Sequence, residues 1–248
     1  LGKDPKGQSG QIIIRKLLEK ELIPLNYNHP KLPYLIKIMG MIFGDGSMNF
    51  IGKRGDGIIG FFSNIKADLG EIKNDLLALG YNSSRVYLHK TKLVYKGKEK
   101  YFNSYRLYVN ASSLLVLFFA LDVPIGKKSS QEYYLPGWLK VAPLWQKRLF
   151  LASIFGAELT TPRPKLSKKG NFYAPVFSMN KREKFLNNGI RFLEEVSLMC
   201  KEFGIEATDL LTRKKYYTKS GDVSWHMELI FSCKPKSLIN LWAKIGFI

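Results

Sequence analysis

The alternation of apolar and polar positions along this chain centres on two short stretches, residues 38–47 and 151–158. The first reads IMGMIFGDGS and the second LASIFGAE. Each apolar run ends on a carboxylate, Asp45 or Glu158. Apolar runs of this kind predict buried helices, so the chain is expected to hold two such helices with one acid at the C-terminal end of each.

Small residues lie four apart in both stretches, Gly40 with Gly44 and Ser153 with Ala157. Residues i and i+4 share one face of a helix, and small side chains on that face let two helix backbones approach closely. Helices packed through these faces would bring the two carboxylates together at one end of the pair.

The rest of the chain alternates between helix-like and strand-like patterns. Apolar residues at three- and four-residue spacing predict helices at 12–22, 34–43, 66–79, 112–121, 146–157, 184–203 and 235–245. Shorter alternating runs predict strands at 57–63, 86–88, 93–95, 101–109, 173–178, 210–217 and 225–232. Residues 48–57, rich in glycine and charge, predict a loop or hairpin, and 126–131 a linker.

Both halves run through the same order of signature helix, loop, strand, helix, strands and helix. Local sequence matches support a duplication. Phe62-Ser63 corresponds to Phe177-Ser178, and residues 104–107 correspond to residues 224–227. We therefore predict an α+β fold of two pseudo-symmetric αββαββα halves, related like the subunits of a symmetric dimer. The predicted parts are an N-terminal extension at 1–30, a first repeat at 31–135 and a second repeat at 136–248.

Positive charge dominates the composition, because 39 Lys and Arg against 20 Asp and Glu give a formal net charge of +19. A chain this basic is expected to bind a polyanion. A basic protein without such a partner and attraction to an anionic membrane surface are the alternatives. No stretch reaches the roughly 18 apolar residues of a membrane span. Cys200 and Cys233 argue against a disulfide framework and favour a reducing, intracellular compartment.

The two acids carry the candidate chemistry. Two carboxylates held close together repel each other, and a hard divalent cation between them relieves the repulsion. Such a metal can also polarise a phosphodiester and supply a hydroxide nucleophile. The alternative is that each acid merely ends an apolar helix, although the helix dipole disfavours an acid there. Asp45 and Glu158 are therefore candidate metal ligands.

The two stretches resemble the paired signature of the LAGLIDADG homing endonucleases, in the single-chain form with two copies. The motif maps onto residues 38–46 and 151–159, and both acids fall on the family's metal-binding positions. The resemblance implies a central pair of signature helices, a saddle of antiparallel sheets for duplex DNA, and metal ligands that include the backbone at Gly44 and Ala157. The second copy departs from the motif, with Glu in place of Asp and Leu159 in place of the final Gly.

The resemblance also implies polar residues that orient water and offset phosphate charge, taken from the strand-to-helix junction of each repeat. That junction holds Asn64 and Lys66 in the first half, and Asn180 and Lys181 in the second. A solvated charge is the alternative for each lysine. Together with the two acids, these four residues are the candidate catalytic residues.

Basic residues interleaved with aromatic ones gather in the predicted strands and the loops between them. A basic sheet can lie in the major groove and contact both bases and phosphates. Arg106 and His226 hold matching strand positions in the two local matches. The candidate DNA-binding residues are Lys90, Lys92, Lys98, Arg106, Arg163, Lys165, Lys168, Arg213, Lys215 and Lys219.

The resemblance implies a sequence-specific endonuclease, of the kind encoded in introns, that hydrolyses both strands of double-stranded DNA. It implies Mg²⁺ or Mn²⁺ as cofactor, with Ca²⁺ as a non-catalytic substitute, and a monomer with internal pseudo-two-fold symmetry and no membrane partner. Two alternatives stay open: a DNA-binding regulator of the same fold that does not cleave, and a maturase that assists RNA splicing. A shared fold alone does not decide between the endonuclease, the regulator and the maturase.

Overall fold

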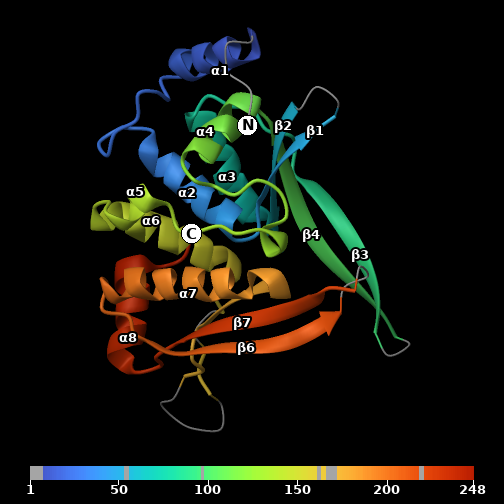
Figure 1. Cartoon of the computed structure of the whole chain (residues 1–248), viewed down its shortest axis with the longest axis vertical. Helices are drawn as coiled ribbons and strands as arrows, with labels where there is room; N and C mark the ends of the chain where they lie inside the picture. The colour runs from blue at the N-terminus through green and yellow to red at the C-terminus, as the bar shows by residue number, and fades with distance from the viewer. Residues whose placement is uncertain (1–7, 53–55, 96–97, 161–162, 166–171, 218–220) are drawn as a thin grey trace. The chain divides into compact units, whose positions relative to one another are not determined.

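The computed structural model describes residues 8–52, 56–95, 98–160, 163–165, 172–217 and 221–248. The chain divides into two compact units, Leu1–Leu121 and Asp122–Ile248. Each unit combines helices with one antiparallel sheet (Figure 1). The predicted mixture of helices with antiparallel sheets is therefore confirmed. Within the described ranges, no helix is both long and apolar enough to cross a membrane.

The first unit holds a four-stranded sheet with helices packed on one face. Its strand order is β1-β2-β4-β3, with every neighbouring pair antiparallel. Helices α3 and α4 pack against β2, and α3 also packs against β4. The elements are α1 (Gln8–Glu19), α2 (Leu32–Phe43), β1 (Ser47–Ile51), β2 (Asp56–Ser63), α3 (Lys66–Ala78), β3 (Tyr87–Tyr95), β4 (Lys98–Asn110) and α4 (Ser112–Ala120).

Alternation along β2 and β4 explains why this sheet has one covered face. Phe61 and Leu107 pair across the two strands, and both are fully buried. Their neighbours Phe62 and Tyr108 point to the opposite face, where their rings meet edge-on at 6.1 Å. Successive side chains of a strand alternate between faces, so the face with Phe61 lies under the helices. We call the opposite face, with Phe62 and Tyr108, the outer face of this sheet.

Strand β3 differs from its prediction. The sequence predicts two short strands, 86–88 and 93–95, separated by the polar residues 89–92. The structure holds one continuous strand, Tyr87–Tyr95, paired without a register shift to β4. The neighbouring strand satisfies the backbone hydrogen bonds of residues 89–92 whatever their side chains are, so polarity does not interrupt the strand.

The second unit holds a three-stranded antiparallel sheet of order β5-β7-β6. Figure 1 shows α7 lying along this sheet, and α7 contacts all three strands. Both cysteines are free, with Cys200 of α7 buried and Cys233 exposed. The elements are η1 (Lys128–Ser130), α5 (Gly137–Lys140), α6 (Leu144–Glu158), β5 (Val176–Arg182), η2 (Glu183–Phe185), α7 (Leu186–Lys201), β6 (Ala207–Tyr217), β7 (Val223–Phe231), α8 (Pro235–Asn240) and a π-helical turn η3 (Leu241–Ile245).

The second sheet is smaller than the predicted αββαββα pattern requires. In the described part of the segment between α6 and β5, the pairing consists of two isolated bridges, Leu159 with Phe177 and Pro164 with Phe172. Thr160 extends the first bridge, because its N–H donates to the Val176 carbonyl (2.9 Å). Within the described residues, a counterpart of β1 is therefore limited to the contact of Leu159 and Thr160 with β5. Superposition of the two halves stays a prediction.

Candidate functional site

The first predicted acid lies in a tight turn directly after α2. The N–H of Gly46 donates to the carbonyl of Met41 (2.8 Å) and folds the chain back over the last helical turn. A Cβ on Gly46 would lie 2.7 Å from the Cα of Ile42, so the turn accommodates only glycine there. Gly44 and Gly46 are buried, whereas Asp45 between them is exposed. The turn therefore presents the Asp45 carboxylate to solvent.

The second predicted acid, Glu158, is the last residue of α6 and is half-buried. Leu159 follows it, is buried, and forms the bridge to Phe177 of β5. Burial raises the pKa of the Tyr133 phenol, and the negative charge of Glu158 raises it further. The Glu158 carboxylate thus lies within electrostatic reach of a buried phenol, in a setting unlike that of the exposed Asp45.

The two acids occupy equivalent positions relative to the paired strands of their sheets. Extension of the β1–β2 register by one step puts the residue after Asp45 opposite Phe61. The residue after Glu158 is bridged to Phe177. Each phenylalanine is buried and pairs with a buried leucine on the next strand, Phe61 with Leu107 and Phe177 with Leu229.

This register corrects the local matches expected from the sequence. It aligns Phe61 with Phe177, so the match of Phe62 to Phe177 is one residue out of register. In the same count, Arg106 corresponds to Glu228 and not to His226. The matching letters in the sequence were therefore a poor guide to which side chains share a face.

The predicted junction residues of the first half lie in an ordered turn between β2 and α3. Asn64 is in the turn and Lys66 is the first residue of α3, and both are exposed. Ser63 shapes this turn, because its Oγ accepts the N–H of Ile65 (3.0 Å) and donates to Asp68 Oδ2 (2.7 Å). The two candidate residues are thus presented from a hydrogen-bonded corner of the sheet.

The corresponding residues of the second half are strand residues and not junction residues, because β5 runs on to Arg182. Asn180 pairs with His226 and is exposed, whereas Lys181 pairs with Trp225 and is completely buried. Neighbours in a strand point to opposite faces. The structure therefore places the side chains of Asn180 and Lys181 on opposite faces of the sheet.

The buried amine of Lys181 has three partners. It donates to the carbonyl of Gln131 (2.6 Å) and to Asn188 Oδ1 (2.9 Å), and it lies 3.8 Å from the centre of the Tyr133 ring. An ammonium has three N–H donors, and two hydrogen bonds with one ring contact engage all three. Burial lowers the pKa of Lys181 to about 7, while the charge of Glu132 acts in the opposite direction.

Side chains of α7 fix the segment that carries Tyr133. Asn188 Oδ1 accepts the N–H of Tyr133 (3.2 Å), and Asn188 Nδ2 donates to the Tyr133 carbonyl (3.0 Å). The ring of Phe192 meets the Tyr133 ring edge-on with centres 5.0 Å apart. Lys181 and α7 together therefore fix Tyr133 in a position where the negative charge of Glu158 raises the pKa of its phenol.

In the first unit, the described members of the predicted DNA-binding set lie on β3 and β4. Lys90 and Lys92 are exposed on β3, and Lys92 forms an ion pair with Glu99 of β4. Arg106 of β4 is half-buried, with its guanidinium 5.8 Å from the centre of the Phe62 ring. Its buried Nε has no hydrogen-bond partner among the described residues. The side chain of Arg106 therefore lies on the outer face of the first sheet, packed against Phe62.

In the second unit, the predicted basic residues whose side chains are described lie beside aromatic or acidic partners. The charged groups of Arg163 and Lys165 lie 5.1 and 5.4 Å from the centre of the Tyr173 ring. Arg213 is exposed on β6 and pairs with Glu228 (2.6 Å). Lys168 and Lys219 lie outside the described residues. Lys98 and Lys215 belong to β4 and β6, but their side chains are not described.

A polar network that the sequence did not predict spans the second sheet on the face away from α7. Glu228 Oε1 accepts from Arg213 Nη2 (2.6 Å) and lies 3.0 Å from His226 Nε2. The other ring nitrogen, Nδ1, lies 3.1 Å from Asn180 Oδ1. The four residues come from three adjacent strands. The sequence feature that could have revealed this network is the two-residue spacing of His226 and Glu228, because residues two apart in a strand lie on the same face.

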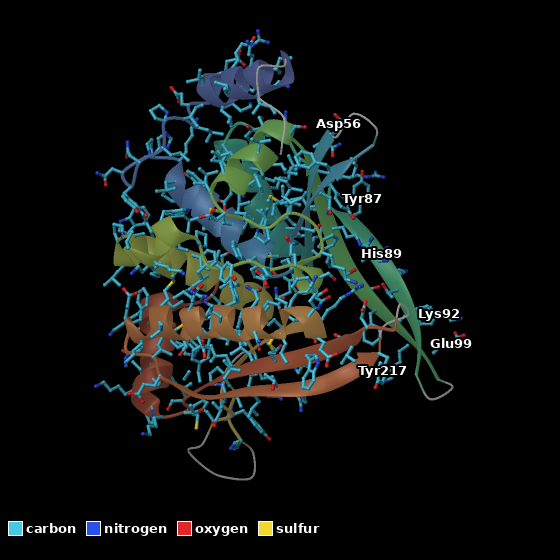
Figure 2. All side chains as sticks on the ribbon, in the orientation of Figure 1. Asp56, Tyr87, His89, Lys92, Glu99 and Tyr217 are labelled. Carbon is cyan, nitrogen blue, oxygen red and sulfur yellow. The ribbon has the colours of Figure 1, made fainter. Side chains whose placement is uncertain are left out.

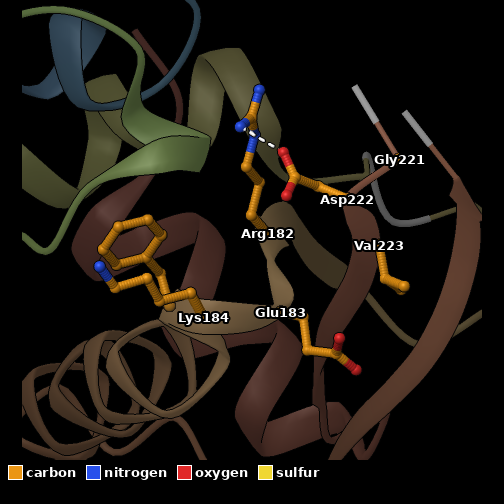
Figure 3. Close-up of a pocket in the computed structure, with 7 residues that line it drawn as sticks. Arg182, Glu183, Lys184, Gly221, Asp222 and Val223 are labelled. Carbon is orange, nitrogen blue, oxygen red and sulfur yellow. Dashed lines mark hydrogen bonds and ion pairs between the residues drawn. The ribbon is translucent and has the colours of Figure 1, made fainter. Parts of the chain in front are cut away.

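A cavity of about 330 Å³ opens where β5 and β7 meet η2 (Figure 3). Arg182 Nη1 donates to Asp222 Oδ2 at its edge (2.6 Å). Its lining mixes two basic with two acidic side chains, so its charge favours no single class of ion. The residues that line it are Arg182, Glu183, Lys184, Phe185, Gly221, Asp222 and Val223, and none of these belongs to the predicted catalytic set.

The predicted metal ligands provide only oxygen donors. They are the exposed carboxylate of Asp45, the half-buried carboxylate of Glu158 and the backbone at Gly44 and Ala157. Such a donor set fits a hard divalent cation. The two acids belong to different units, so their approach to each other stays a prediction. Within the described part of the chain, no three His, Cys, Asp or Glu side chains gather into a metal-binding group.

Segments of archaeal proteins with different names are similar to this chain, whereas no family model matches it. The chain is 37% identical over 200 residues to the DNA-directed RNA polymerase subunit Rpo1N of Methanocaldococcus jannaschii. It is 33% identical over 198 residues to the tRNA-splicing ligase RtcB of Pyrococcus abyssi, and 28% over 194 residues to the replication factor C small subunit of M. jannaschii. These alignments cover 78%, 79% and 78% of this chain but only 14%, 21% and 10% of the relatives.

Two solved structures share the fold. The homing endonuclease I-WcaI, bound to its DNA recognition sequence, matches with a TM-score of 0.53 over 93% of this chain and 98% of that chain, at 13% identity. Full-length DUF199/WhiA from Thermatoga maritima matches with a TM-score of 0.51 over 93% of this chain and 61% of that chain, at 12% identity. At these identities the likeness concerns the fold alone.

Proposed function

We propose that this chain is a sequence-specific endonuclease that cuts both strands of duplex DNA with a divalent metal, in the manner of the LAGLIDADG homing endonucleases. One observation carries the proposal. In each unit a carboxylate lies at or just after the end of an apolar helix, Glu158 as the last residue of α6 and Asp45 in the turn after α2, and the chain continues in the same register into an antiparallel sheet. The shared fold with I-WcaI, a homing endonuclease bound to its DNA, supports it.

In this proposal the acids hold the metal and the sheets hold the DNA. The carboxylates of Asp45 and Glu158 and the backbone at Gly44 and Ala157 bind Mg²⁺ or Mn²⁺, and Ca²⁺ substitutes without catalysis. When bound, the metal activates water and offsets charge on the phosphate. The exposed side chains of Asn64, Lys66 and Asn180 orient water and contact the phosphate. The basic strand residues bind the DNA backbone and bases.

Lys181 takes a different part from the one expected from the sequence. Its amine is completely buried, and two of its N–H groups are bound to protein oxygens. A direct contact with a phosphate would require the amine to leave these partners. We therefore assign it the positioning of Tyr133, whose phenol lies within reach of the charge on Glu158.

The names of the relatives do not transfer to this chain. Alignments of about 200 residues of this chain match an RNA polymerase subunit, a tRNA-splicing ligase and a replication factor subunit, and they cover between 10% and 21% of each. One segment cannot supply three different activities. We infer that the chain is a module that recurs within unrelated proteins, with a function of its own that is separate from RNA ligation or transcription.

The test uses a plasmid library with a randomised insert and the full chain in Mg²⁺. The proposal expects cut plasmids whose new ends share one sequence. Asp45→Asn and Glu158→Gln preserve shape but remove a charged metal ligand, so cutting should fall by at least about 100-fold while binding survives. Lys66→Met should slow cutting less, because that lysine only assists. The exposed acids Asp56 and Glu194 provide matched controls, and Asp56→Asn and Glu194→Gln should cut at the wild-type rate.

A second candidate function is DNA binding without cleavage. The observation that favours it is the second motif, where Leu159 is buried against β5 and Glu158 is only half-exposed beside Tyr133. A wild-type chain that binds one selected sequence tightly, yet leaves it uncut in both Mg²⁺ and Mn²⁺, would contradict the nuclease and favour the regulator. Cutting of one strand only would assign the defect to one of the two acids.

A further inference from the structure

The polar network on the face of the second sheet away from α7 contains a hydrogen-bond pattern that depends on one proton. His226 Nδ1 lies 3.1 Å from Asn180 Oδ1, and His226 Nε2 lies 3.0 Å from Glu228 Oε1. Both oxygens are acceptors, so both ring nitrogens meet an acceptor. A neutral imidazole has one N–H and one lone pair, whereas an imidazolium has two N–H donors. The geometry therefore fits the protonated ring.

The sheet holds the ring between these partners. Asn180 of β5 lies directly opposite His226 of β7, and Arg213 of β6 lies opposite it on the other side. Glu228 follows two residues along β7 and lies on the same face. The side chains of His226 and Glu228 are only 17% and 20% exposed. Because both ring nitrogens are held at their partners, a change of charge on the ring must be met by those partners.

The charged side chains beside His226 come from all three strands. The carboxylate of Glu228 attracts an imidazolium, whereas Arg213, which donates to the same Oε1 (2.6 Å), repels it. On β5, Arg182 lies on this face and is paired with Asp222 (2.6 Å). A charged acceptor binds an N–H more strongly than a neutral one, so the proton on Nε2 stays with Glu228. The ring therefore loses its proton from Nδ1.

Loss of the Nδ1 proton turns the amide of Asn180. The lone pair of a neutral Nδ1 would face Asn180 Oδ1, and two acceptors at 3.1 Å have no donor between them. A half turn of the amide replaces Oδ1 with Nδ2, which donates to Nδ1. The two ends of an amide are nearly equal in size, so the half turn moves nothing else. The protonated ring thus directs the amide nitrogen away from itself, and the neutral ring directs the amide oxygen away.

We propose that His226 is a positioning residue for Asn180, and that its protonation decides which end of the exposed amide, the N–H donor or the oxygen acceptor, is offered to a DNA phosphate. The proposal rests on the function proposed above, in which Asn180 contacts the phosphate. Asn180 lies three residues, about 10 Å, along β5 from Phe177, which is bridged to the residue after Glu158. Phosphate oxygens accept hydrogen bonds, so DNA binding should strengthen as the pH falls and the ring gains its proton.

Nuclear magnetic resonance of the full chain, without DNA or metal, tests the coupling directly. The His226 ring and the Asn180 side-chain amide are followed between about pH 5 and pH 8, where histidines change charge. Above the midpoint of the ring, a scalar coupling should connect Asn180 Nδ2 with His226 Nδ1 across their hydrogen bond. Below the midpoint it should vanish. Absence of this coupling above the midpoint would overturn the proposal, and the measurement needs no variant.

Two other side chains serve as controls for this titration. Asn240 Nδ2 donates to the backbone carbonyl of Gly204 (2.9 Å), a group that does not titrate, so its amide signals should not follow the ring. Figure 2 shows His89, which lies on β3 of the first unit and pairs with Ser104. His89→Gln should leave the titration of the Asn180 amide unchanged, whereas His226→Gln, which cannot titrate, should abolish it.

Binding to DNA tests what the orientation of the amide does. The probe is a labelled duplex that the wild-type chain selects from a randomised library in Ca²⁺ without Mg²⁺. From about pH 8 to about pH 5, the affinity of the wild type relative to His226→Gln should rise by about 3- to 10-fold, the effect of one hydrogen bond. The ratio removes the contribution of other titrating groups. A ratio that stays constant or falls would overturn the proposal.

A double variant separates positioning from direct attraction. An imidazolium attracts phosphate through its charge whether or not an amide lies beside it. Asn180→Ala removes the amide and keeps that charge. If His226 acts through Asn180, adding His226→Gln to Asn180→Ala should change the pH dependence by less than about twofold. An effect of His226→Gln as large in Asn180→Ala as in the wild type would overturn the positioning role.

The outcomes separate this proposal from the function on which it rests. A wild-type chain that binds no duplex, even at low salt, would overturn the proposed DNA binding and with it the phosphate contact of Asn180. The resonance measurement on the chain alone would still show whether His226 turns the amide. Circular dichroism and thermal melting of each variant show that the compared chains are folded.

Discussion

The burial and the charge state of single residues in this protein depend on their surroundings more than on their residue type. Lys181 is one of 39 basic residues, and a solvated charge was the ordinary expectation for it. It is instead completely buried, beneath a tyrosine ring and between two oxygen acceptors. Burial penalises the charged form of an amine, so its protonation couples to the stability of the fold.

The buried amine leads to a prediction about pH. The pKa of Lys181 is lowered to about 7 in the folded chain and is about 10.5 in the unfolded chain. Between these values the unfolded state binds more protons, so this group makes the free energy of unfolding rise with pH, by up to about 1.4 kcal/mol per unit. From pH 7 to 8.5, the wild type should gain about 1–2 kcal/mol relative to Lys181→Met, measured by urea denaturation.

Subtracting the variant removes the contribution of other titrating groups, such as the buried Cys200 thiol, whose pKa is raised by burial. Lys201→Met, which removes an exposed lysine at the end of α7, is the matched control and should run parallel to the wild type. Parallel profiles for the wild type and Lys181→Met would show that the amine does not titrate in this range.

At the scale of elements, helix ends and strand partners decide what the candidate site presents. The turn after α2 closes over Gly46 and exposes its acid, whereas α6 runs to its acid and is followed by the buried Leu159. Strand β3 remains continuous through polar residues because β4 offers a partner along its whole length. Local sequence sets the type of each element, but neighbouring elements set where it ends.

The turn after α2 leads to a prediction about stability. A methyl group at Gly46 would meet the backbone of Ile42 at 2.7 Å, and a backbone atom cannot move aside cheaply. Gly46→Ala should therefore lower the free energy of unfolding by about 1–3 kcal/mol. Gly70 is the control, because it lies within α3 with open space around its Cα. Gly70→Ala should stabilise the chain by about 0.5–1 kcal/mol.

Equilibrium denaturation in guanidinium chloride measures both changes. Destabilisation by Gly70→Ala as large as that by Gly46→Ala would mean that the crowded turn is not what distinguishes the two sites. A neutral effect of Gly46→Ala would mean that the turn can open without cost, and the exposed position of Asp45 would then have another cause.

At the scale of the whole molecule, the charge and the order of elements dominate. The net charge of +19 is spread over both halves, and each half repeats a helix, a strand, a helix and a strand pair. The two sheets share a register counted from their acids, but among the described residues they differ in strand number, with four strands in the first and three in the second.

The charge leads to a prediction about salt. Each phosphate neutralised by Lys or Arg releases counterions, so the logarithm of affinity should fall with the logarithm of salt concentration, by about 0.9 per contact. For roughly six to ten contacts, affinity for duplex DNA should drop by about 10³- to 10⁵-fold between 50 and 200 mM salt. Fluorescence anisotropy of a labelled duplex measures the slope.

One lysine on β4 and one on α7 test where the phosphate contacts lie. Lys100→Met, on the part of β4 that pairs with β3 beyond the last β2–β4 pair, should reduce the slope by about one if its ammonium contacts a phosphate. Lys201 lies on α7, which covers the face of the second sheet opposite to Asn180 and His226. Lys201→Met should therefore leave the slope unchanged. Binding without salt dependence would exclude both the nuclease and the regulator.

The sequence by itself determined the types of most elements, their order and the position of both acids at or just after the end of an apolar helix. Hydrophobic periodicity and glycine positions are local, and they act through burial and backbone geometry that any tertiary arrangement must respect. Asp45 and Glu158, the strand pair β6–β7 and the helix α3 were all predicted in this way. So was the hairpin β1–β2, as one of two possibilities for its segment.

Only the tertiary structure decided strand register and burial, because both depend on partners that are distant in the sequence. A shift of one residue reverses the face of every side chain in a strand. The match of Phe62 to Phe177 failed by that one residue, and Asn180 and Lys181 separated to opposite faces once β5 continued to Arg182. The burial of Lys181, the exposure of Asp45 and the continuity of β3 follow from pairing and packing that local patterns do not contain.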